Sequence, residues 1–254
     1  MVEQKQGEIH LFLNRPHVRN AFNEETISDL SRFADWVEEQ KDVRMVFLQG
    51  KGKLFCAGGD LNWMKDSLNW DQRTNYADSM KLSNMLTKLN QLSKPLIGLI
   101  HQGAYGGGVG LVTVCDHIIA TKETTFSLSE VRLGLIPACI GPFVLDKVGM
   151  GHCRSLFISG ERFSAEKALQ IGLINEVVED VKAMEEARNR FSACIQNCGP
   201  HAIETAKNFL REVKKLDLIM ANELASRTLA DLRVGSEAQE GIRAFLEKRI
   251  PNWS

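Results

Sequence analysis

At 254 residues, with 44% hydrophobic and 25% charged residues, the chain has the composition of an ordinary globular protein that can bury a large core. Its formal net charge at pH 7 is −1, and its lysines and arginines are spread along the sequence, which argues against a nucleic-acid partner. No segment approaches the roughly 20 apolar residues that span a bilayer, and the polar N-terminus lacks the pattern of a secretory signal, so we expect a cytoplasmic protein without a membrane partner.

The first fifty residues have the pattern of a strand, a helix and a second strand. The apolar stretches EIHLFLNRP, residues 8–16, and VRMVFLQG, residues 43–50, predict buried strands. Between them, Asn23 is expected to cap a helix that carries two glutamates in its first turn. The apolar residues that recur at helical spacing in this helix are Ile27, Leu30, Phe33, Ala34 and Val37.

The middle of the chain alternates helix and strand, and its end is helical. The elements predicted in the middle are a helix over 71–92, a strand over 94–100, a helix from about Gly108, and a strand and loop over 117–137. Beyond about Gly149, the pattern predicts helices over 164–171, 181–197, 200–213, 218–232 and 236–248. Ser236 and Gln239 are expected to form a capping box at the last of them. The layout indicates an α/β core followed by a helical C-terminal part.

The side chains that commonly bind metals do not follow ligand patterns. No cysteine belongs to a C-x-x-C pair, and the six histidines show no H-x-x-x-H spacing, so no metal site is expected. In a reducing compartment the cysteines are interpreted as small apolar core residues. They are Cys56, Cys115, Cys139, Cys153, Cys194 and Cys198.

The segment HQGAYGGGVGLVTVCD, residues 101–116, contains five glycines directly after an apolar strand. A strand that leads through a glycine-rich turn into a helix points unpaired backbone N–H groups at a negative charge. The segment is not a dinucleotide fingerprint, because Leu111 stands where G-x-G-x-x-G needs its last glycine. It is not a phosphate loop, because no Gly-Lys-Ser/Thr follows, and it contains no G-x-S-x-G nucleophile elbow.

A second segment, MVFLQGKGKLFCAGGDLNWM over residues 45–64, is built in the same way. An apolar strand leads to a turn of small residues, 57–59, and Asp60 stands at the start of a predicted helix. If the two turns converge, their amides form an oxyanion hole that stabilises a thioester carbonyl as it becomes an enolate. The same glycines are also compatible with ordinary tight turns beside packed helices.

Several motifs, taken in order, resemble one family. FCAGGDL, HQGAYGGGVGLVTVCDHIIA and FSLSEVRLGLIP are similar to segments of the crotonase, or enoyl-CoA hydratase/isomerase, superfamily, and the resemblance extends from LNRPHVRNAFN to EGIRAFLEKRIPNW. It implies an α/β fold of spiral ββα units in two roughly perpendicular sheets. It further implies a core over 1–195 with the CoA-thioester site, and a helical oligomerisation region over 196–254 that assembles homotrimers or dimers of trimers.

The resemblance also implies the residues of the site. The backbone amides of Gly59 and Gly107 would form the oxyanion hole, and Glu130 would be the catalytic carboxyl group. Coenzyme A is then part of the substrate, and no separate cofactor is implied. Phe245 and Lys248 resemble tail residues that reach a CoA site, in some members that of a neighbouring subunit; the alternative is a plain surface helix. The other residues expected to contact CoA are Arg19, Ala21, Ala57, Asp60 and Leu61.

Glu130 has two interpretations. Taken by itself, a glutamate in SLSEVRLG is a solvated residue or a salt-bridge partner, for instance of Arg132. Enclosed beside an apolar acyl pocket, as the resemblance implies, its pKa would rise and make it a better proton shuttle near neutral pH. The pocket walls are expected from 66–78 and 135–143. The remaining candidate polar contacts, each more readily explained as a structural or surface residue, are His10, His101, Arg132 and Cys139.

One position departs from the family pattern. Typical hydratases of the family carry a second glutamate on the helix after the GGG turn, where this chain has Gly110. AYGGGVGL, LSEVRLGLIPA and GPFV most resemble bacterial hydratases of methylglutaconyl-CoA and isohexenylglutaconyl-CoA, which favours a hydratase of a branched glutaconyl-CoA. Two alternatives stay open: a double-bond isomerase that uses one glutamate, and a weakly active acyl-CoA-binding scaffold.

Overall fold

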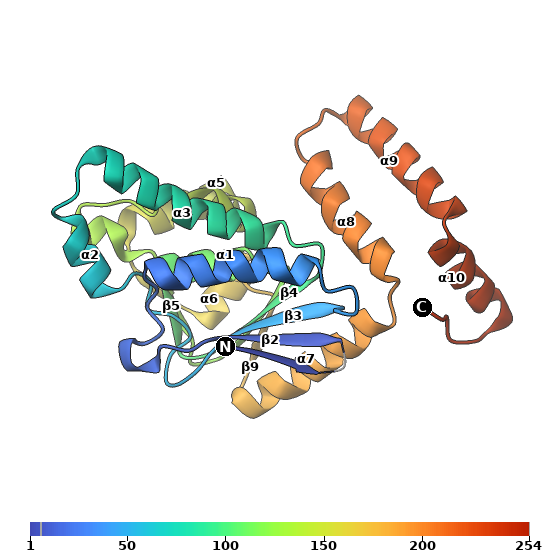
Figure 1. Ribbon diagram of the computed structural model, residues 1–254, viewed down its shortest axis with the longest axis horizontal. Helices are drawn as coiled ribbons and strands as arrows, with labels where there is room; N and C mark the ends of the chain where they lie inside the picture. The colour runs from blue at the N-terminus through green and yellow to red at the C-terminus, as the bar shows by residue number, and fades with distance from the viewer. Residues whose placement is uncertain (6, 254) are drawn as a thin grey trace.

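The computed structural model describes residues 1–5 and 7–253. Its larger sheet contains six strands in the order β1-β2-β3-β4-β6-β9 (Figure 1). Only β1 is antiparallel to its neighbour; the other strands run parallel. The strands are Val2–Lys5 (β1), Glu8–Leu13 (β2), Met45–Gly50 (β3), Leu96–Ile100 (β4), His117–Thr121 (β6) and Glu176–Val178 (β9).

Helices cover both faces of this sheet, which explains why β4 is apolar and buried along its whole length. Val46 and Leu48 of β3 pack toward α1 (Glu24–Glu38) and α3 (Gln72–Asn90), whereas Met45 and Phe47 pack toward α7 (Val181–Gln196) on the opposite face (Figure 1). The remaining helices of the core are α2 (Leu61–Ser67), α4 (Gly107–Thr113), α5 (Gly141–Ser159) and α6 (Ala165–Gln170), with short 3₁₀ helices at Pro16–Val18 (η1) and Ser129–Leu133 (η2).

A smaller sheet of three strands positions the glycine-rich segments. It has the order β5-β7-β8, formed by Gly103–Tyr105, Thr125–Ser127 and Arg162–Ser164. Ala104, Phe126 and Phe163, which are neighbours across the three strands, are all buried in the core. An isolated bridge of Cys56 with Ala104 ties the segment before the small-residue turn to this sheet, and a second bridge joins Gly59 to Phe22.

The C-terminal helices extend away from the core. They are α8 (Pro200–Val213), α9 (Leu218–Val234) and α10 (Ser236–Glu247), and Figure 1 shows α9 and α10 beyond α8 on the side away from the sheets. The Lys207 ammonium of α8 donates to the Lys94 carbonyl at 2.8 Å and pairs with the Asp116 carboxylate. The Arg211 guanidinium donates to the Asn90 carbonyl at 2.9 Å. These polar contacts fasten α8 to the core.

Most predicted elements are confirmed, including the Asn23 cap, whose side chain accepts a hydrogen bond from the Thr26 N–H at 3.1 Å. None of the helices in the described ranges is long and apolar enough to cross a bilayer. The α/β arrangement expected from the sequence, with two sheets and C-terminal helices, is present.

Three expectations are wrong. The region beyond Gly149 is not purely helical, because β8 and β9 lie within it and β9 pairs with β6. No capping box starts α10: Gly235 precedes the helix without a side-chain cap, and the Gln239 amide donates to the Arg233 carbonyl instead. The cysteines are not all core residues. Cys194 and Cys198 are exposed, because they lie at the solvent-facing end of α7 and in the loop after it.

Candidate active site

The backbone N–H of Gly59 is left open by the local strand pairing. The Phe22 N–H donates to the Gly58 carbonyl at 2.8 Å, and the Asp60 N–H donates to the Phe22 carbonyl at 3.0 Å. In such a parallel bridge the residue between the two bonded neighbours turns its own N–H away. In residues 1–5 and 7–253, the Gly59 N–H donates to no carbonyl or side chain.

The N–H of Gly107 is open for a different reason. Gly107 is the first residue of α4, and the first N–H groups of a helix have no acceptor within it. Its N-cap, Gly106, has φ 51° and ψ −124°, a conformation that favours glycine. A Cβ atom on Gly58 would lie 3.5 Å from the Gly107 nitrogen, so the two glycine segments are in contact. This contact places Gly107 beside the segment that carries Gly59.

The crowding explains why glycines stand here. A Cβ atom on Gly107 would lie 2.3 Å from Cζ of Phe22, and one on Gly58 would lie 2.7 Å from the Tyr105 carbonyl oxygen. Both distances are too short for real contacts. The two turns are therefore held together more closely than any residue with a side chain would allow.

The carboxyl group of Glu130 lies against the start of α4. A Cβ atom on Gly106 would lie 3.1 Å from Glu130 Oε1, and Oε2 is buried without a hydrogen-bond partner among the described residues. Burial removes water from the carboxylate and raises the pKa of Glu130, with a smaller opposing effect from its own backbone N–H. No salt bridge joins Glu130 to Arg132 within the described chain.

The space beside Gly110 is filled by carbon atoms. A Cβ atom on Gly110 would lie 2.4 Å from Cγ2 of Ile140, 3.1 Å from its Cβ, and 3.5 Å from Cδ1 of Leu86. Ile140 is buried, with 2% of its surface exposed. A glutamate at position 110 could enter only if Ile140 moved away. The departure noted in the sequence is thus matched by a side chain from the loop before α5.

Trp63 of α2 lies against Gly59. Its ring would lie 3.4 Å from a Cβ atom on Gly59, and its centroid is 6.4 Å from that of Phe22. The indole N–H of Trp63 donates to Asp78 Oδ1 at 3.3 Å, and burial raises the pKa of that carboxyl group. Asp78 and Ile140 belong to the two segments expected to form the pocket walls.

A family model for enoyl-CoA hydratase/isomerase matches residues 3–254. The chain belongs to this family. The 2,3-dehydroadipyl-CoA hydratase of Escherichia coli (strain K12) is 30% identical over 255 residues, which cover 100% of this chain and 97% of that protein. The short-chain-enoyl-CoA hydratase of Clostridium acetobutylicum is 29% identical over 252 residues, which cover 98% of this chain and 95% of that protein.

The similarity extends to solved structures. The crystal structure of an enoyl-CoA hydratase from Shewanella pealeana superposes with a TM-score of 0.95 at 32% identity, and the match covers 99% of this chain and 94% of that one. The protein is therefore an enzyme of the enoyl-CoA hydratase family, with activity on unsaturated acyl-CoA thioesters. Neither relative named above is a methylglutaconyl-CoA hydratase.

The residues of 19–61 that are expected to contact CoA lie in or beside the glycine turn, but some are buried and others are exposed. The Ala57 N–H donates to the Arg19 carbonyl at 3.0 Å, which places these two residues side by side. Asp60 is buried; its carboxylate accepts from the Asn62 N–H and pairs with the Arg15 guanidinium at 2.9 Å, and these contacts lower its pKa. The Asp60 side chain therefore serves the fold. Ala21 is buried and Leu61 is 80% exposed.

A cavity of about 290 Å³ adjoins this turn and is strongly basic. None of its three arginines forms a salt bridge within the residues described, and Arg162 also lies over the Tyr105 ring at 5.3 Å. The cavity suits an anionic part of a ligand. The sequence does not reveal this cavity, because its three arginines are far apart along the chain and Arg162 belongs to β8. Its lining is Arg19, Leu54, Ala57, Tyr105, Ser127, Ser129, Arg132 and Arg162.

Other predicted residues lie elsewhere. Phe245 and Lys248 belong to the end of α10, which Figure 1 shows at the opposite end of the molecule from α2. His10 bonds to Gln49 and lies near Arg188 of α7, and the His101 ring lies 3.0 Å from the Gly52 carbonyl oxygen. Cys139, next to Ile140, donates to the Ser79 carbonyl.

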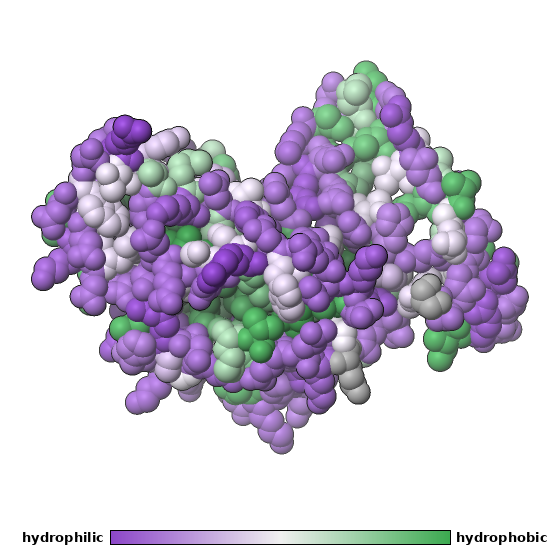
Figure 2. Space-filling view, viewed as in Figure 1, coloured by the Kyte–Doolittle hydropathy of each residue, from purple (hydrophilic) through white to green (hydrophobic). Residues whose placement is uncertain are grey.

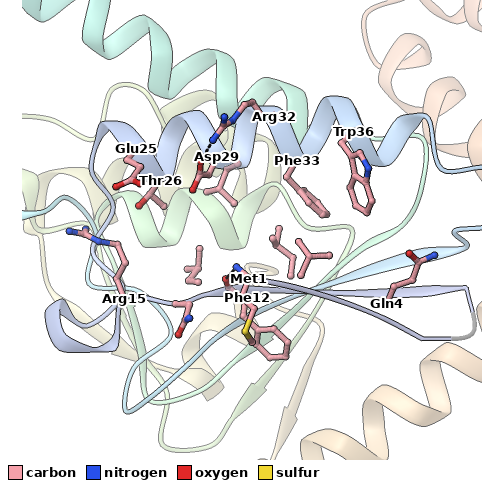
Figure 3. Close-up of a pocket in the computed structure, with 15 residues that line it drawn as sticks. Met1, Gln4, Phe12, Arg15, Glu25, Thr26, Asp29, Arg32, Phe33 and Trp36 are labelled. Carbon is pink, nitrogen blue, oxygen red and sulfur yellow. Dashed lines mark hydrogen bonds and ion pairs between the residues drawn. The ribbon is translucent and has the colours of Figure 1, made fainter.

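A separate groove of about 970 Å³ lies between α1 and strands β1 and β2 (Figure 3). Leu11, Leu30 and Phe33 are among its apolar lining residues, and Asp29 and Arg32 form an ion pair at its edge. It contains none of the site residues predicted from the sequence. In the described part of the chain, no three His, Cys, Asp or Glu side chains gather as they would around a metal ion.

Proposed function

We propose that the protein hydrates an α,β-unsaturated acyl-CoA whose acyl group carries a distal carboxylate, such as a branched glutaconyl-CoA. One observation carries this proposal: Glu130 offers a buried, unpaired carboxyl oxygen, while carbon atoms of Ile140 fill the place of a second acid. A carboxylate on the substrate can supply the missing polar group. The E. coli relative is named for 2,3-dehydroadipyl-CoA, whose acyl group ends in a carboxylate.

In this mechanism the N–H groups of Gly59 and Gly107 donate to the thioester oxygen. As Glu130 takes a proton from water, the water oxygen bonds to the β-carbon. The electron pair of the carbon–carbon double bond moves to form a double bond between the α-carbon and the thioester carbon, and the carbonyl electron pair moves onto the thioester oxygen. The two amides stabilise the resulting enolate, a contribution on the order of 3 kcal/mol for one such donor in other enzymes. Glu130 then returns the proton to the α-carbon, and the net change is the addition of one water molecule.

The substrate's own carboxylate accepts a hydrogen bond from the attacking water and orients it. A raised pKa suits Glu130 to both halves of the cycle, because it must accept a proton and release it near neutral pH. Arg19, Ala57 and the basic cavity beside them hold the CoA portion of the substrate, together with the backbone of Ala21, Asp60 and Leu61.

A second candidate activity, double-bond isomerisation, is favoured by the same observation. A single carboxyl group is sufficient to remove a proton from one carbon of an enolate system and return it to another. This activity would use Glu130 and the two amides without any water.

Mass spectrometry separates the two activities. The purified protein is incubated with 3-methylglutaconyl-CoA and, separately, with a 3-enoyl-CoA. A gain of one water on the first substrate is expected. An unchanged mass there, with the second substrate converted to its conjugated isomer of equal mass, which is recognised by its ultraviolet absorbance and its chromatographic retention, would establish the isomerase instead. Binding without any conversion would leave an acyl-CoA-binding scaffold. Equal rates on 3-methylcrotonyl-CoA, which lacks the distal carboxylate, would contradict its proposed role.

We also infer that residues 196–254 assemble the chain into trimers, or dimers of trimers, in which Phe245 and Lys248 reach the CoA site of a neighbouring copy. The distance between α10 and α2 within one chain supports action on another copy (Figure 1). Phe245 is 83% exposed, and Lys248 is also exposed, so both side chains are available to a second subunit.

A further inference from the structure

Three arginines from separate parts of the chain line the cavity of about 290 Å³ beside the glycine turn. Arg19 follows η1, Arg132 lies in η2, and Arg162 begins β8. Within residues 1–5 and 7–253, no carboxylate forms an ion pair with any of these guanidinium groups, and the cavity lining includes no aspartate or glutamate. Like charges held together without a counter-ion repel one another, and an anionic ligand removes this repulsion.

The small sheet and the segment beside it position two of these side chains. Tyr105, Ser127 and Arg162 are direct neighbours across β5, β7 and β8, so their side chains share one face of the sheet. The Arg162 guanidinium lies over the Tyr105 ring, 5.3 Å from its centroid. Nε of Arg132 would lie 3.5 Å from a Cβ atom on Gly160, two residues before Arg162. The two arginines therefore reach the cavity from adjoining segments.

Arg19 has a backbone conformation that arginine rarely adopts. Its φ is 56° and its ψ is 38°, in the left-handed region, and Asn20 after it also has φ 56°. This conformation is unfavourable for an L-residue, and hydrogen bonds maintain it: the Arg19 N–H donates to the Pro16 carbonyl at 3.1 Å, and the Ala57 N–H donates to the Arg19 carbonyl at 3.0 Å. Residues strained in this way are frequent where a chain holds a ligand.

The size and charge of the cavity favour a phosphate group. At about 290 Å³ it is slightly smaller than the pockets of roughly 300–1,000 Å³ that hold whole small molecules, so it accommodates a charged group rather than the complete coenzyme. Guanidinium groups bind phosphate oxygens through paired N–H donors. Ala57, which lines the cavity, is two residues before Gly59, and the pantetheine arm of CoA is flexible enough to bend back from the thioester to this point.

We propose that Arg19, Arg132 and Arg162 bind a phosphate group of the coenzyme and thereby make the enzyme select thioesters of complete CoA over thioesters of pantetheine alone. This inference rests on the proposed function, in which the cavity holds the CoA portion of the substrate, and it specifies the group that is bound and the side chains that bind it. The 3′-phosphate of the ribose and the diphosphate share this chemistry. Because both are remote from the double bond, the contact acts on binding rather than on proton transfer.

Three thioesters with the same acyl group identify the phosphate. The wild-type protein is assayed with 3-methylglutaconyl thioesters of CoA, of dephospho-CoA, which lacks the 3′-phosphate, and of pantetheine, which lacks every phosphate. Loss of a charged hydrogen-bonded contact should lower kcat/KM about 10- to 100-fold, and we expect this loss for pantetheine. A similar loss for dephospho-CoA assigns the 3′-phosphate, and an unchanged value assigns the diphosphate. Equal kcat/KM for all three thioesters would overturn the inference.

Arginine variants locate the selectivity in the cavity, because pantetheine also lacks the adenosine of CoA. Arg132→Gln and Arg162→Gln should each lower the ratio of kcat/KM for the CoA thioester to that for the pantetheine thioester by about 10-fold or more, through KM. Arg154→Gln changes an exposed arginine of α5 outside the cavity and is the matched control, with the wild-type ratio. A ratio measured within one variant does not depend on how much of the protein folds. The wild-type ratio in both cavity variants would contradict the assignment.

A glycine at position 19 separates the side chain from its turn. Glycine adopts φ 56° readily, so Arg19→Gly keeps the turn and removes the guanidinium group. We expect the same fall in the ratio as in the other cavity variants, without a lower melting temperature. An unchanged ratio would remove Arg19 from the phosphate site.

Binding of free CoA keeps this test separate from the proposed function. Calorimetry measures the Kd of CoA for the wild-type protein and for Arg162→Gln without any turnover. A Kd about 10-fold or more higher in the variant is expected, and it supports the phosphate site even where no thioester is hydrated. Equal Kd values would overturn the inference, whether or not thioesters are hydrated.

Discussion

At the scale of single residues, burial of Glu130 changes the pKa of the carboxyl group that is proposed to move the proton. Because burial raises its pKa above the ordinary value of 4.5, the carboxylate form that accepts a proton is lost as the pH falls through this raised value. We therefore expect the kcat/KM of the wild-type protein, measured as a function of pH, to decline on the acidic side at a pH above 4.5.

Glu130→Gln should lower kcat about 10²- to 10⁴-fold, while binding of a CoA thioester, measured by calorimetry, is retained. Normal turnover in this variant would remove Glu130 from the mechanism.

The same variant has an opposite effect on stability. A carboxyl group whose pKa is higher in the folded than in the unfolded chain favours folding when protonated and loses this contribution as the pH rises through the folded-state pKa. At neutral pH the neutral amide of Glu130→Gln should therefore increase the free energy of unfolding. Urea denaturation at several pH values checks this, because the gain should disappear below the pKa of the unfolded glutamate. A variant that is less stable at neutral pH would indicate that the carboxylate is paired in the folded protein.

At the scale of elements, one buried side chain holds the loop that carries the glycine turn. The Asn20 amide donates to the Lys51 carbonyl at 2.8 Å and the Leu54 carbonyl at 2.7 Å, and its Oδ1 accepts from the Arg15 N–H at 2.9 Å. Asn20→Ala leaves these groups unsatisfied and should cost about 3 kcal/mol in the free energy of unfolding, measured in urea. Asn14, in the segment that leads to Asn20, is exposed. Asn14→Ala should therefore change the free energy of unfolding by less than about 0.5 kcal/mol. Equal effects of the two changes would rule out a special role for Asn20.

The same scale shows what a sequence can and cannot reveal. The helix α1 is predictable because five apolar residues repeat at helical spacing behind a capping asparagine. The helix α5 is not, because Gly149 has φ 70° within it and breaks the pattern, and β8 and β9, with three residues each, are too short for alternation to show. In the site, the glycine-rich turn can be recognised from the sequence because five glycines occur within residues 101–116. The contact of Ile140 with Gly110 joins residues 30 positions apart and depends on packing that no local pattern records.

At the scale of the whole molecule, the C-terminal helices expose an apolar surface that a single chain does not cover. Figure 2 shows hydrophobic residues along the helices that extend from the core. Exposing so much apolar area is unfavourable for an isolated chain, and it is typical of surfaces that become buried in an assembly. The exposed apolar residues of α9, α10 and the segment after them include Leu218, Ile219, Val234, Phe245, Leu246 and Ile250.

If Lys248 completes the CoA site of a neighbouring subunit, two defective variants should repair each other. Lys248→Glu removes the cation and should weaken CoA-thioester binding about 10-fold, whereas Glu130→Gln removes the carboxyl group that moves the proton. When the two variants are co-expressed, a mixed oligomer contains some sites that combine Glu130 of one subunit with Lys248 of the other. Activity at limiting substrate should then exceed the sum of the separate variants, and light scattering should show trimers or hexamers. If Lys248 instead acts within its own chain, every site in the mixture keeps one defect, because each chain carries one, and no recovery occurs.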